Sequence, residues 1–213
     1  MARSHPVLLL LLQLLLPASA SPPYTAAYVE HHATSACGSG SCGAQTKRKN
    51  VLAYVAFVAA AAAKHADIIA FPEYGITGFS SLPLADWVQG GYTETIPPSP
   101  KPGAPKVVPC TSRSDAFSGA PSVVALSCAA QAHGVAIVAN LVDYDATGKG
   151  ALYNTDVALD SDGAFLARYH KLNLWGEGNI DVPGDCPEAS FRTVRLTRMS
   201  LRYAHIPPLA PPL

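Results

Sequence analysis

The stretch KRKNVLAYVAFVAAAAAKHADIIAFPEYG, residues 47–75, decides the fold class of this 213-residue chain. Residues Lys47 to Ala66 favour a helix and include an unbroken alanine run from Ala59 to Ala63. This helix is apolar on most of its sides, so we expect other elements to cover it. A short apolar run, Asp67 to Phe71, follows at once and predicts a buried strand. A helix that leads directly into such a strand indicates the α/β class.

The same alternation continues on both sides of this stretch. Pro121 to His133 predicts a helix, because proline lies in its first turn and Gly134 is a natural stop. Two alternating runs around Ser161-Asp162-Gly163 predict a hairpin. The expected order is a strand over 24–30, a loop over 31–46, the helix and strand above, an irregular proline-rich segment over 97–109, a helix over 121–133, a strand over 135–142, and hairpin strands over 151–160 and 164–169.

The composition limits the class of protein. The formal net charge is zero, and only 14% of the residues are charged. A chain of this length and apolar content predicts one globular domain with a hydrophobic core. The low charge and the absence of a basic excess argue against a nucleic-acid partner.

The N-terminus resembles a secretory signal peptide. Arg3 and His5 precede an apolar stretch from Val7 to Leu16, and Ala18-Ser19-Ala20 follows as a small-x-small cleavage site. A membrane anchor is the alternative, but the apolar stretch is too short to span a bilayer comfortably. We therefore expect residues 1–20 to be a signal peptide and the mature protein to be secreted.

Secretion places the five cysteines in an oxidising compartment. Cys110 and Cys128 flank one segment of loop and helix and are the best candidate disulfide pair. Cys37 and Cys42 could close a small ring or lie in a flexible loop. Cys186 is then left over.

The last segment, residues 191–213, differs from the rest of the chain. It contains four arginines at helical spacing, no acidic residue, and four prolines in its final seven positions. A basic helix on a membrane surface is one interpretation. We favour a disordered or foreign tail, because the α/β pattern stops here. The expected organisation is therefore a signal peptide over 1–20, a domain over 21–190 and an atypical tail over 191–213.

Two short segments carry the residues with chemical potential. Phe71-Pro72-Glu73-Tyr74-Gly75 presents a carboxylate after one strand, and Tyr169-His170-Lys171-Leu172-Asn173-Leu174-Trp175 presents an amine after another. A carboxylate base and a cation for an oxyanion are two of the three groups that open an amide through a nucleophile. Taken alone, Glu73 is better interpreted as an ordinary solvated residue in a turn, and Lys171 could likewise be a surface lysine.

An ordered set of blocks resembles the carbon–nitrogen hydrolase (nitrilase) superfamily, in its pantetheinase (vanin) and biotinidase branch. The resemblance covers about Tyr24 to Pro183. Its blocks are Tyr24 to His31, Ala66 to Ile76, Val108-Pro109-Cys110, Leu126-Ser127-Cys128-Ala129, Val138-Ala139-Asn140, Tyr153-Asn154-Thr155-Asp156-Val157, Ala167 to Leu174 and Asp181-Val182-Pro183. The resemblance implies a four-layer αββα sandwich, of which this chain would form the N-terminal half.

The resemblance also implies roles for individual residues. Glu73 matches the base that takes the proton from a catalytic cysteine, and Lys171 matches the cation that stabilises the oxyanion. Glu177 fits either a second carboxylate that positions the lysine or a simple loop carboxylate. The family cleaves small-molecule amides, such as pantetheine or biotinyl amides, without a cofactor or metal. We expect Trp175 to pack against the fold rather than to stack on a substrate.

The sequence departs from the family at the nucleophile. The family's cysteine follows a further strand after the lysine, in a Cys-Phe-Asp segment, and no such segment occurs here. Cys186 comes too early, is followed by Pro187 and has no apolar strand before it. We therefore expect a C-terminally truncated amidohydrolase that is inactive in this form. The alternatives are a secreted binding or decoy protein and an unstable product of splicing or of an incorrect gene model.

The signal peptide gives the first testable prediction. Protein recovered from the medium of secreting cells should begin at Ser21, because cleavage follows Ala20. N-terminal sequencing of that material measures the cleavage site. Intact protein starting at Met1 in the cytosol would contradict the assignment.

Overall fold

The computed structural model describes residues 23–34, 42–78, 83–112, 115–147, 150–184 and 196. The predicted signal peptide, and the predicted tail apart from Leu196, lie outside these residues. Within them, the strands form one sheet in the order β1-β2-β3-β4-β5. Pairs β1–β2 and β2–β3 are parallel, and pairs β3–β4 and β4–β5 are antiparallel. The strands are β1 Ala26–Tyr28, β2 Ile68–Ala70, β3 Ala136–Asp145, β4 Ala151–Leu159 and β5 Phe165–His170.

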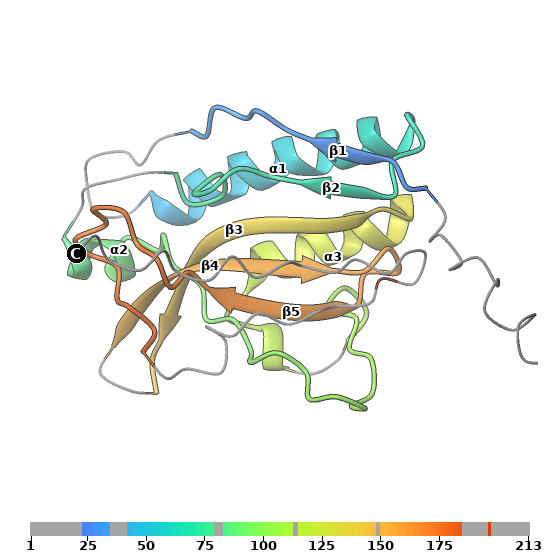
Figure 1. Cartoon of the computed structure of the whole chain (residues 1–213). Coiled ribbons are helices and arrows are strands. Elements are labelled where there is room, and N and C mark those ends of the chain that lie inside the picture. Colours follow the sequence, from blue (N-terminus) through green and yellow to red (C-terminus); the bar gives the residue numbers. More distant parts are fainter. Residues whose placement is uncertain are drawn as a thin grey trace, which may run out of the picture.

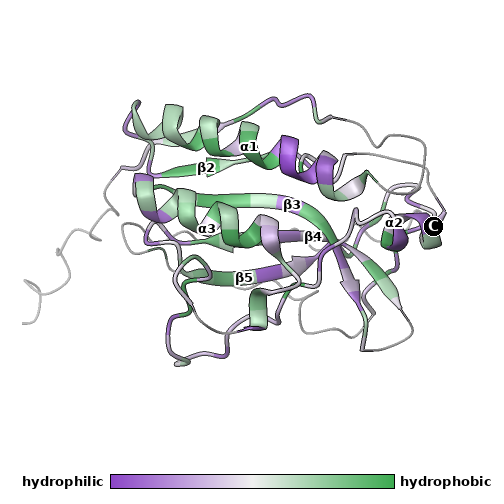
Figure 2. Ribbon diagram, turned by 180° about the vertical axis from the view of Figure 1, so that it is seen from behind, coloured by the Kyte–Doolittle hydropathy of each residue, from purple (hydrophilic) through white to green (hydrophobic). Residues whose placement is uncertain are grey.

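Helices α1 (Gly43–Ala62) and α3 (Pro121–His133) lie side by side on one face of this sheet (Figures 1 and 2). The short helix α2 (Leu84–Gln89) lies beyond one end of the sheet, and a 3-10 turn, Asp115–Phe117, precedes α3. Between the helices and the sheet lies the main core, in which Tyr54, Leu126 and Leu141 are fully buried. Burial of this kind is the dominant stabilising contribution to a domain of this size.

The observed elements agree closely with the expected ones. The second predicted helix has the predicted bounds, and Gly134 ends it in the left-handed region with φ 67°. The ends of the two hairpin strands differ from the predicted ends by no more than one residue. The largest shift is in α1, which begins at Gly43 instead of Lys47 and ends at Ala62. Gly43 sits so close to Gly90 and Gly91 that a Cβ there would meet their backbone at 2.4–2.5 Å, a contact that sequence alone does not reveal.

The opposite face of the sheet is less well covered. The pairing register places Ile68, Ala70, Val138 and Ala158 on this face, and all four are only partly buried. Leu196 packs here against Ala136 and is 5% exposed. One helical layer on one sheet with a second apolar sheet face corresponds to half of an αββα sandwich, as expected.

A buried ion pair joins the two helices to the loop after α2. Lys47 in α1 lies 3.1 Å from Glu94, and both side chains are almost completely buried. Glu94 also accepts hydrogen bonds from the backbone N–H and the hydroxyl of Ser122, at the start of α3. A buried charge is tolerated only when it is paired. The pairing with Glu94 therefore allows Lys47 to be buried in a helix that the sequence predicted to be apolar on most of its sides.

The described residues contain no helix with the length and apolar character needed to cross a membrane. The predicted disulfide between Cys110 and Cys128 is present, with a Cα–Cα distance of 4.9 Å. It ties the proline-rich segment to α3, and the Cys110 backbone N–H also donates to the hydroxyl of Ser127 in that helix.

Loss of this disulfide should weaken the fold. In the double variant Cys110→Ala/Cys128→Ala we expect the free energy of unfolding to fall by about 3 kcal/mol, because the bridge closes a loop with a sequence separation of 18 residues. Urea unfolding followed by circular dichroism measures the change. Equal stability of the variant and the wild type, with linked Cys110 and Cys128 peptides in the wild type, would contradict the prediction.

Candidate active site

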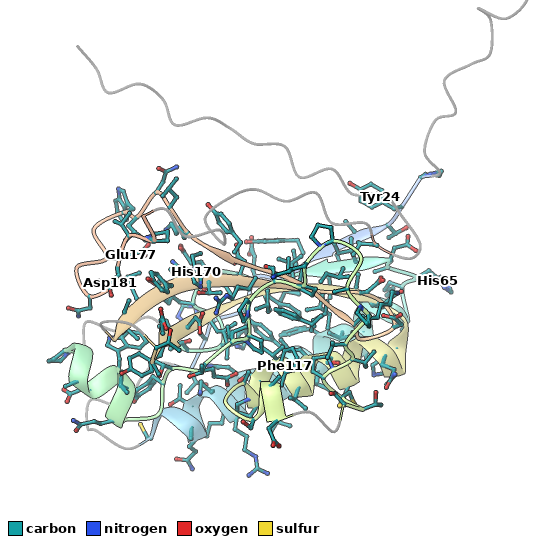
Figure 3. The ribbon with its side chains drawn as sticks, turned by 90° about the horizontal axis from the view of Figure 1, so that it is seen from below. Tyr24, His65, Phe117, His170, Glu177 and Asp181 are labelled. Atoms are coloured by element: carbon teal, nitrogen blue, oxygen red, sulfur yellow. A yellow bond between two sulfur atoms is a disulfide. The ribbon has the colours of Figure 1, made fainter. Side chains whose placement is uncertain are left out.

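The candidate site lies at the edge of the sheet where β2, β3 and β5 have their carboxyl ends. In Figure 3 the labelled Glu177 and His170 lie toward the end of the molecule opposite Tyr24 and His65. Glu73 follows β2, and Lys171 follows β5 directly. Because β2 and β5 run in the same direction on either side of the β3–β4 pair, their carboxyl ends meet at one edge. Ligands of α/β sheets commonly bind at this edge.

A tight turn over residues 72–78 presents Glu73. The Gly75 N–H donates to the Pro72 carbonyl, and Tyr74 lies in the left-handed region with φ 54°. Such a conformation is uncommon for a residue with a side chain and costs on the order of 1 kcal/mol. Gly75 is required next to it, since a Cβ there would lie 1.7 Å from the hydroxyl oxygen of Tyr54.

Lys171 joins the two candidate carboxylates. Its Nζ lies 2.7 Å from Glu73 Oε1 and 2.6 Å from Glu177 Oε1. The Glu177 side chain is 7% exposed, whereas that of Glu73 is 50% exposed. The fold thus brings together all three residues that the sequence singled out. Glu177 contacts the lysine directly.

The charges of this cluster support one another. Burial alone would raise the pKa of Glu177, but hydrogen bonds from Lys171, Asn154 and Tyr74 outweigh it, and the net pKa is lowered. Burial likewise acts to lower the pKa of Lys171, but its bonds to Glu177 and Glu73 outweigh this effect and raise it. Lys171 is therefore held as an ammonium and Glu177 as a carboxylate at neutral pH.

Two asparagines that sequence reasoning did not single out complete the cluster. Asn154 in β4 donates from Nδ2 to Glu73 Oε1 at 2.7 Å and to Glu177 Oε2 at 3.2 Å. Asn140 in β3 donates to Asn154 Oδ1 at 2.6 Å. Both residues were noticed only as parts of longer blocks. The available signal was an amide side chain inside a mainly apolar strand, because buried polar groups need partners.

Asp156 and Tyr74 form the border of the cluster. Asp156 accepts a hydrogen bond from Asn140, and burial raises its pKa. The Tyr74 hydroxyl donates to Glu177 Oε2 at 3.0 Å. Burial, together with the neighbouring charge of Glu177, raises the pKa of this hydroxyl and keeps it protonated.

A second polar cluster lies at the end of β5, in the residues that precede Lys171. Asp143 Oδ2 lies 2.8 Å from an Arg168 guanidinium nitrogen and 3.0 Å from His170 Nε2, and all three side chains are largely buried. The imidazole of His170 stacks on the ring of Tyr153, with centroids 4.1 Å apart. This cluster fixes the strand end from which Lys171 emerges.

Among the described residues, no free thiol lies beside Glu73 and Lys171. The described cysteines are Cys42, Cys110 and Cys128, and all three are disulfide-bonded. Cys37 and Cys186 lie outside the described residues. Among the described residues no group of three or more His, Cys, Asp and Glu side chains is arranged to hold a metal ion.

The expectation for Trp175 was wrong. Its side chain is 89% exposed, in the loop between Lys171 and Glu177, so it does not pack against the fold. The chain leaves the sheet after His170, and the following loop is held through Lys171, Glu177 and Asp181. Trp175 projects from that loop.

Comparison with known proteins agrees with this architecture. The carbon-nitrogen hydrolase family matches residues 33–201, and the chain belongs to this family. Within it the relatives include proteins of the pantetheinase and biotinidase branch. Pantetheinase of Sus scrofa is 37% identical over an alignment of 148 residues that covers 64% of this chain and 27% of that protein. Biotinidase of Takifugu rubripes is 30% identical over an alignment of 161 residues that covers 70% of this chain and 30% of that protein.

Pantetheinase of Homo sapiens is 31% identical over an alignment of 193 residues that covers 83% of this chain and 36% of that protein. The chain therefore spans about a third of the length of these relatives. Among solved structures, a carbon-nitrogen hydrolase from Helicobacter pylori G27 superposes with a TM-score of 0.51 at 18% identity. It covers 83% of this chain and 49% of that one, and it supports the αββα fold class.

The ion cluster predicts how stability depends on pH. Because the pKa of Glu177 is lowered in the folded state, its ionisation stabilises the fold above the unfolded-state value of about 4.3. This contribution is lost as the pH falls through the lower, folded-state pKa. In Lys171→Met the pKa of Glu177 should rise, since burial then acts with fewer compensating bonds. The gain in stability between acid pH and about pH 5 should shrink accordingly.

Urea unfolding from acid to neutral pH measures this difference. Lys64→Met, which replaces an exposed lysine after α1, is the matched control and should follow the wild-type profile. Superimposable profiles for the wild type and Lys171→Met would mean that the cluster does not form in solution.

Proposed function

We propose that this chain carries the base and oxyanion groups of a secreted amidohydrolase of the pantetheinase and biotinidase type. The observation that supports the proposal is the bridge from Lys171 to Glu73 and Glu177, across 98 and 6 positions of sequence. A surface lysine gains little from one exposed ion pair. A lysine between two carboxylates, one of which is buried, has its ammonium group held in a fixed position.

Each group has a definite part in the proposed reaction. Glu73 accepts the proton of an attacking thiol, because an ordinary thiol has a pKa near 8.5 and is mostly protonated at neutral pH. The Lys171 ammonium stabilises the negative charge that develops on the amide carbonyl oxygen as the thiol adds. Glu177 keeps Lys171 in place and charged. The products would be a thioester and an amine, and water would then hydrolyse the thioester.

The proposed substrates are small linear amides. The names of the relatives indicate pantetheine for one group and biotin amides for the other. The half-exposed Glu73 and the partly exposed Lys171 make the candidate site open to a small molecule from solvent.

The nucleophile is the group that the described site does not contain. We propose that this 213-residue chain alone has no amidase turnover, because base and oxyanion cation act through the thiol. Removing the nucleophile from such a catalytic unit commonly reduces kcat by several orders of magnitude. Binding of the amide without cleavage, as in a decoy protein, is the alternative, since Lys171 and Glu73 would still be available to a ligand.

Turnover and acylation can be measured on the same sample. The purified chain should release neither cysteamine from pantetheine nor biotin from a biotinyl amide above a heat-treated control. After incubation with an activated acyl substrate, intact mass spectrometry should find no thioester. Stoichiometric acylation of Cys186 that disappears in Glu73→Gln would contradict the predicted inactivity while supporting the amidohydrolase chemistry.

Calorimetry with pantetheine and biotinyl amide then tests the alternative. Binding that is lost in Lys171→Met and kept in Lys64→Met, without turnover, would favour a decoy. If the folded chain shows no turnover and no binding, the site is a structural remnant.

A further inference from the structure

We propose that Asn140 and Asn154 form an amide relay that positions Glu73, so that its Oε2 is the atom that takes the proton from the attacking thiol. Asn140 and Asn154 are positioning residues in this proposal, and Glu73 is the group that reacts. The inference rests on the proposed function for the thiol step alone. The relay itself rests on the hydrogen bonds of the described residues.

The relay starts at a main-chain amide. The Tyr74 N–H donates to Asn140 Oδ1 at 2.7 Å in a buried position. A backbone N–H can only donate, so the oxygen of the Asn140 amide must face Tyr74. The Asn140 nitrogen must then face the other way, where it donates to Asn154 Oδ1 at 2.6 Å and Asp156 Oδ1 at 2.9 Å.

The second amide passes this orientation to the carboxylates. With its oxygen on Asn140, Asn154 turns its nitrogen to Glu73 Oε1 and Glu177 Oε2. A flipped Asn154 would place its oxygen against two carboxylates and its nitrogen against the N–H group of Asn140, which is unfavourable on both sides. Each asparagine thus uses both of its N–H groups, and one backbone amide sets the direction of the whole chain of donors.

The relay has two consequences for Glu73. It anchors the turn that carries Glu73, because Asn140 holds the amide of Tyr74, the residue with a φ of 54°. It also determines which carboxylate oxygen is available. Both Asn154 and Lys171 bond to Oε1 at 2.7 Å, and no described residue donates a hydrogen bond to Oε2.

The proton transfer then has a defined path. The S–H bond of the thiol breaks, its electron pair stays on sulfur as the thiolate, and the proton forms an O–H bond at Glu73 Oε2. Oε1 keeps its bonds to Lys171 and Asn154 throughout this step. A carboxylate held by one oxygen and open at the other is suited to general-base work, because its geometry is fixed while one acceptor remains unused.

The relay can be tested in the chain as it exists, without turnover. Asn154→Leu should raise the pKa of Glu177, since a donor to its ionised form is removed. Asn140→Leu should also raise it, although Asn140 touches neither Glu73 nor Glu177. If Asn140→Leu does not fold, Asn140→Ser removes the same amide with a smaller change. Carbon-13 NMR titration of labelled glutamates measures these values.

Crystal structures of the variants provide the second readout. In each relay variant the Glu73 carboxylate should leave the orientation in which Oε1 meets Lys171. Ser127→Ala is the matched control. Ser127 is fully buried and its hydroxyl bonds to the Gly163 carbonyl, at the opposite end of β5 from Lys171. This variant should lose stability without changing the pKa of Glu177 or the orientation of Glu73.

The outcomes separate the relay from the proposed function. A folded Asn140 variant with wild-type Glu177 titration and wild-type Glu73 orientation would overturn the relay. An equal change in the pKa of Glu177 in Ser127→Ala would also overturn the relay, since the change would then result from general destabilisation. The titrations can agree with the relay while no amide is bound or cleaved when an added peptide supplies the thiol. In that case the relay stands and the proposed amidohydrolase function fails.

Discussion

The parallel pairing of β2 with β3 is the constraint on which the site depends. Its register places Ala70 beside Val138, and the Phe71 N–H continues the ladder to the Val138 carbonyl. Asn140 lies two residues beyond Val138 and Glu73 lies two residues beyond Phe71, so the turn that carries Glu73 and Tyr74 meets Asn140. A shift of one residue would turn Asn140 to the other face of the sheet, and the Tyr74 amide would lose its acceptor. The site is thus an extension of the sheet beyond its last ladder hydrogen bonds.

The helices make this register possible by burying one face of the sheet. Tyr54 of α1 illustrates the coupling, because its ring stacks on Phe71 with centroids 3.7 Å apart while its hydroxyl closes over Gly75. The same side chain therefore packs in the core and shapes the turn below Glu73. Polar groups are concentrated at one end of the sheet, where Asp143 with Arg168 and Asn140 with Asn154 satisfy one another. The low dielectric constant of the protein interior strengthens the bonds between such paired groups and makes the loss of one partner costly.

Much of the fold followed from residue pattern. The helix over 121–133 and the hairpin were predicted almost to the residue, because proline, glycine and alternation mark their limits locally. The start of α1 and the whole of α2 were not predicted. Gly43 begins α1 because the chain near Gly90 crosses it closely, and contacts of that kind join segments distant in sequence. The partly exposed sheet face agrees with half of a sandwich, and among the described residues Leu196 packs against it.

For the candidate site, the sequence by itself identified Glu73 and Lys171 as groups at strand ends and left Glu177 with two interpretations. Residue type and strand position were sufficient for that, because charged residues that follow apolar strands are visible in the chain itself. Only the tertiary structure decided that Glu177 contacts the lysine, that Asn140 and Asn154 connect the turn to both carboxylates, and that Trp175 is exposed. The physical reason is that hydrogen-bond partners are chosen by distance and direction between strands, and neither is encoded in local pattern.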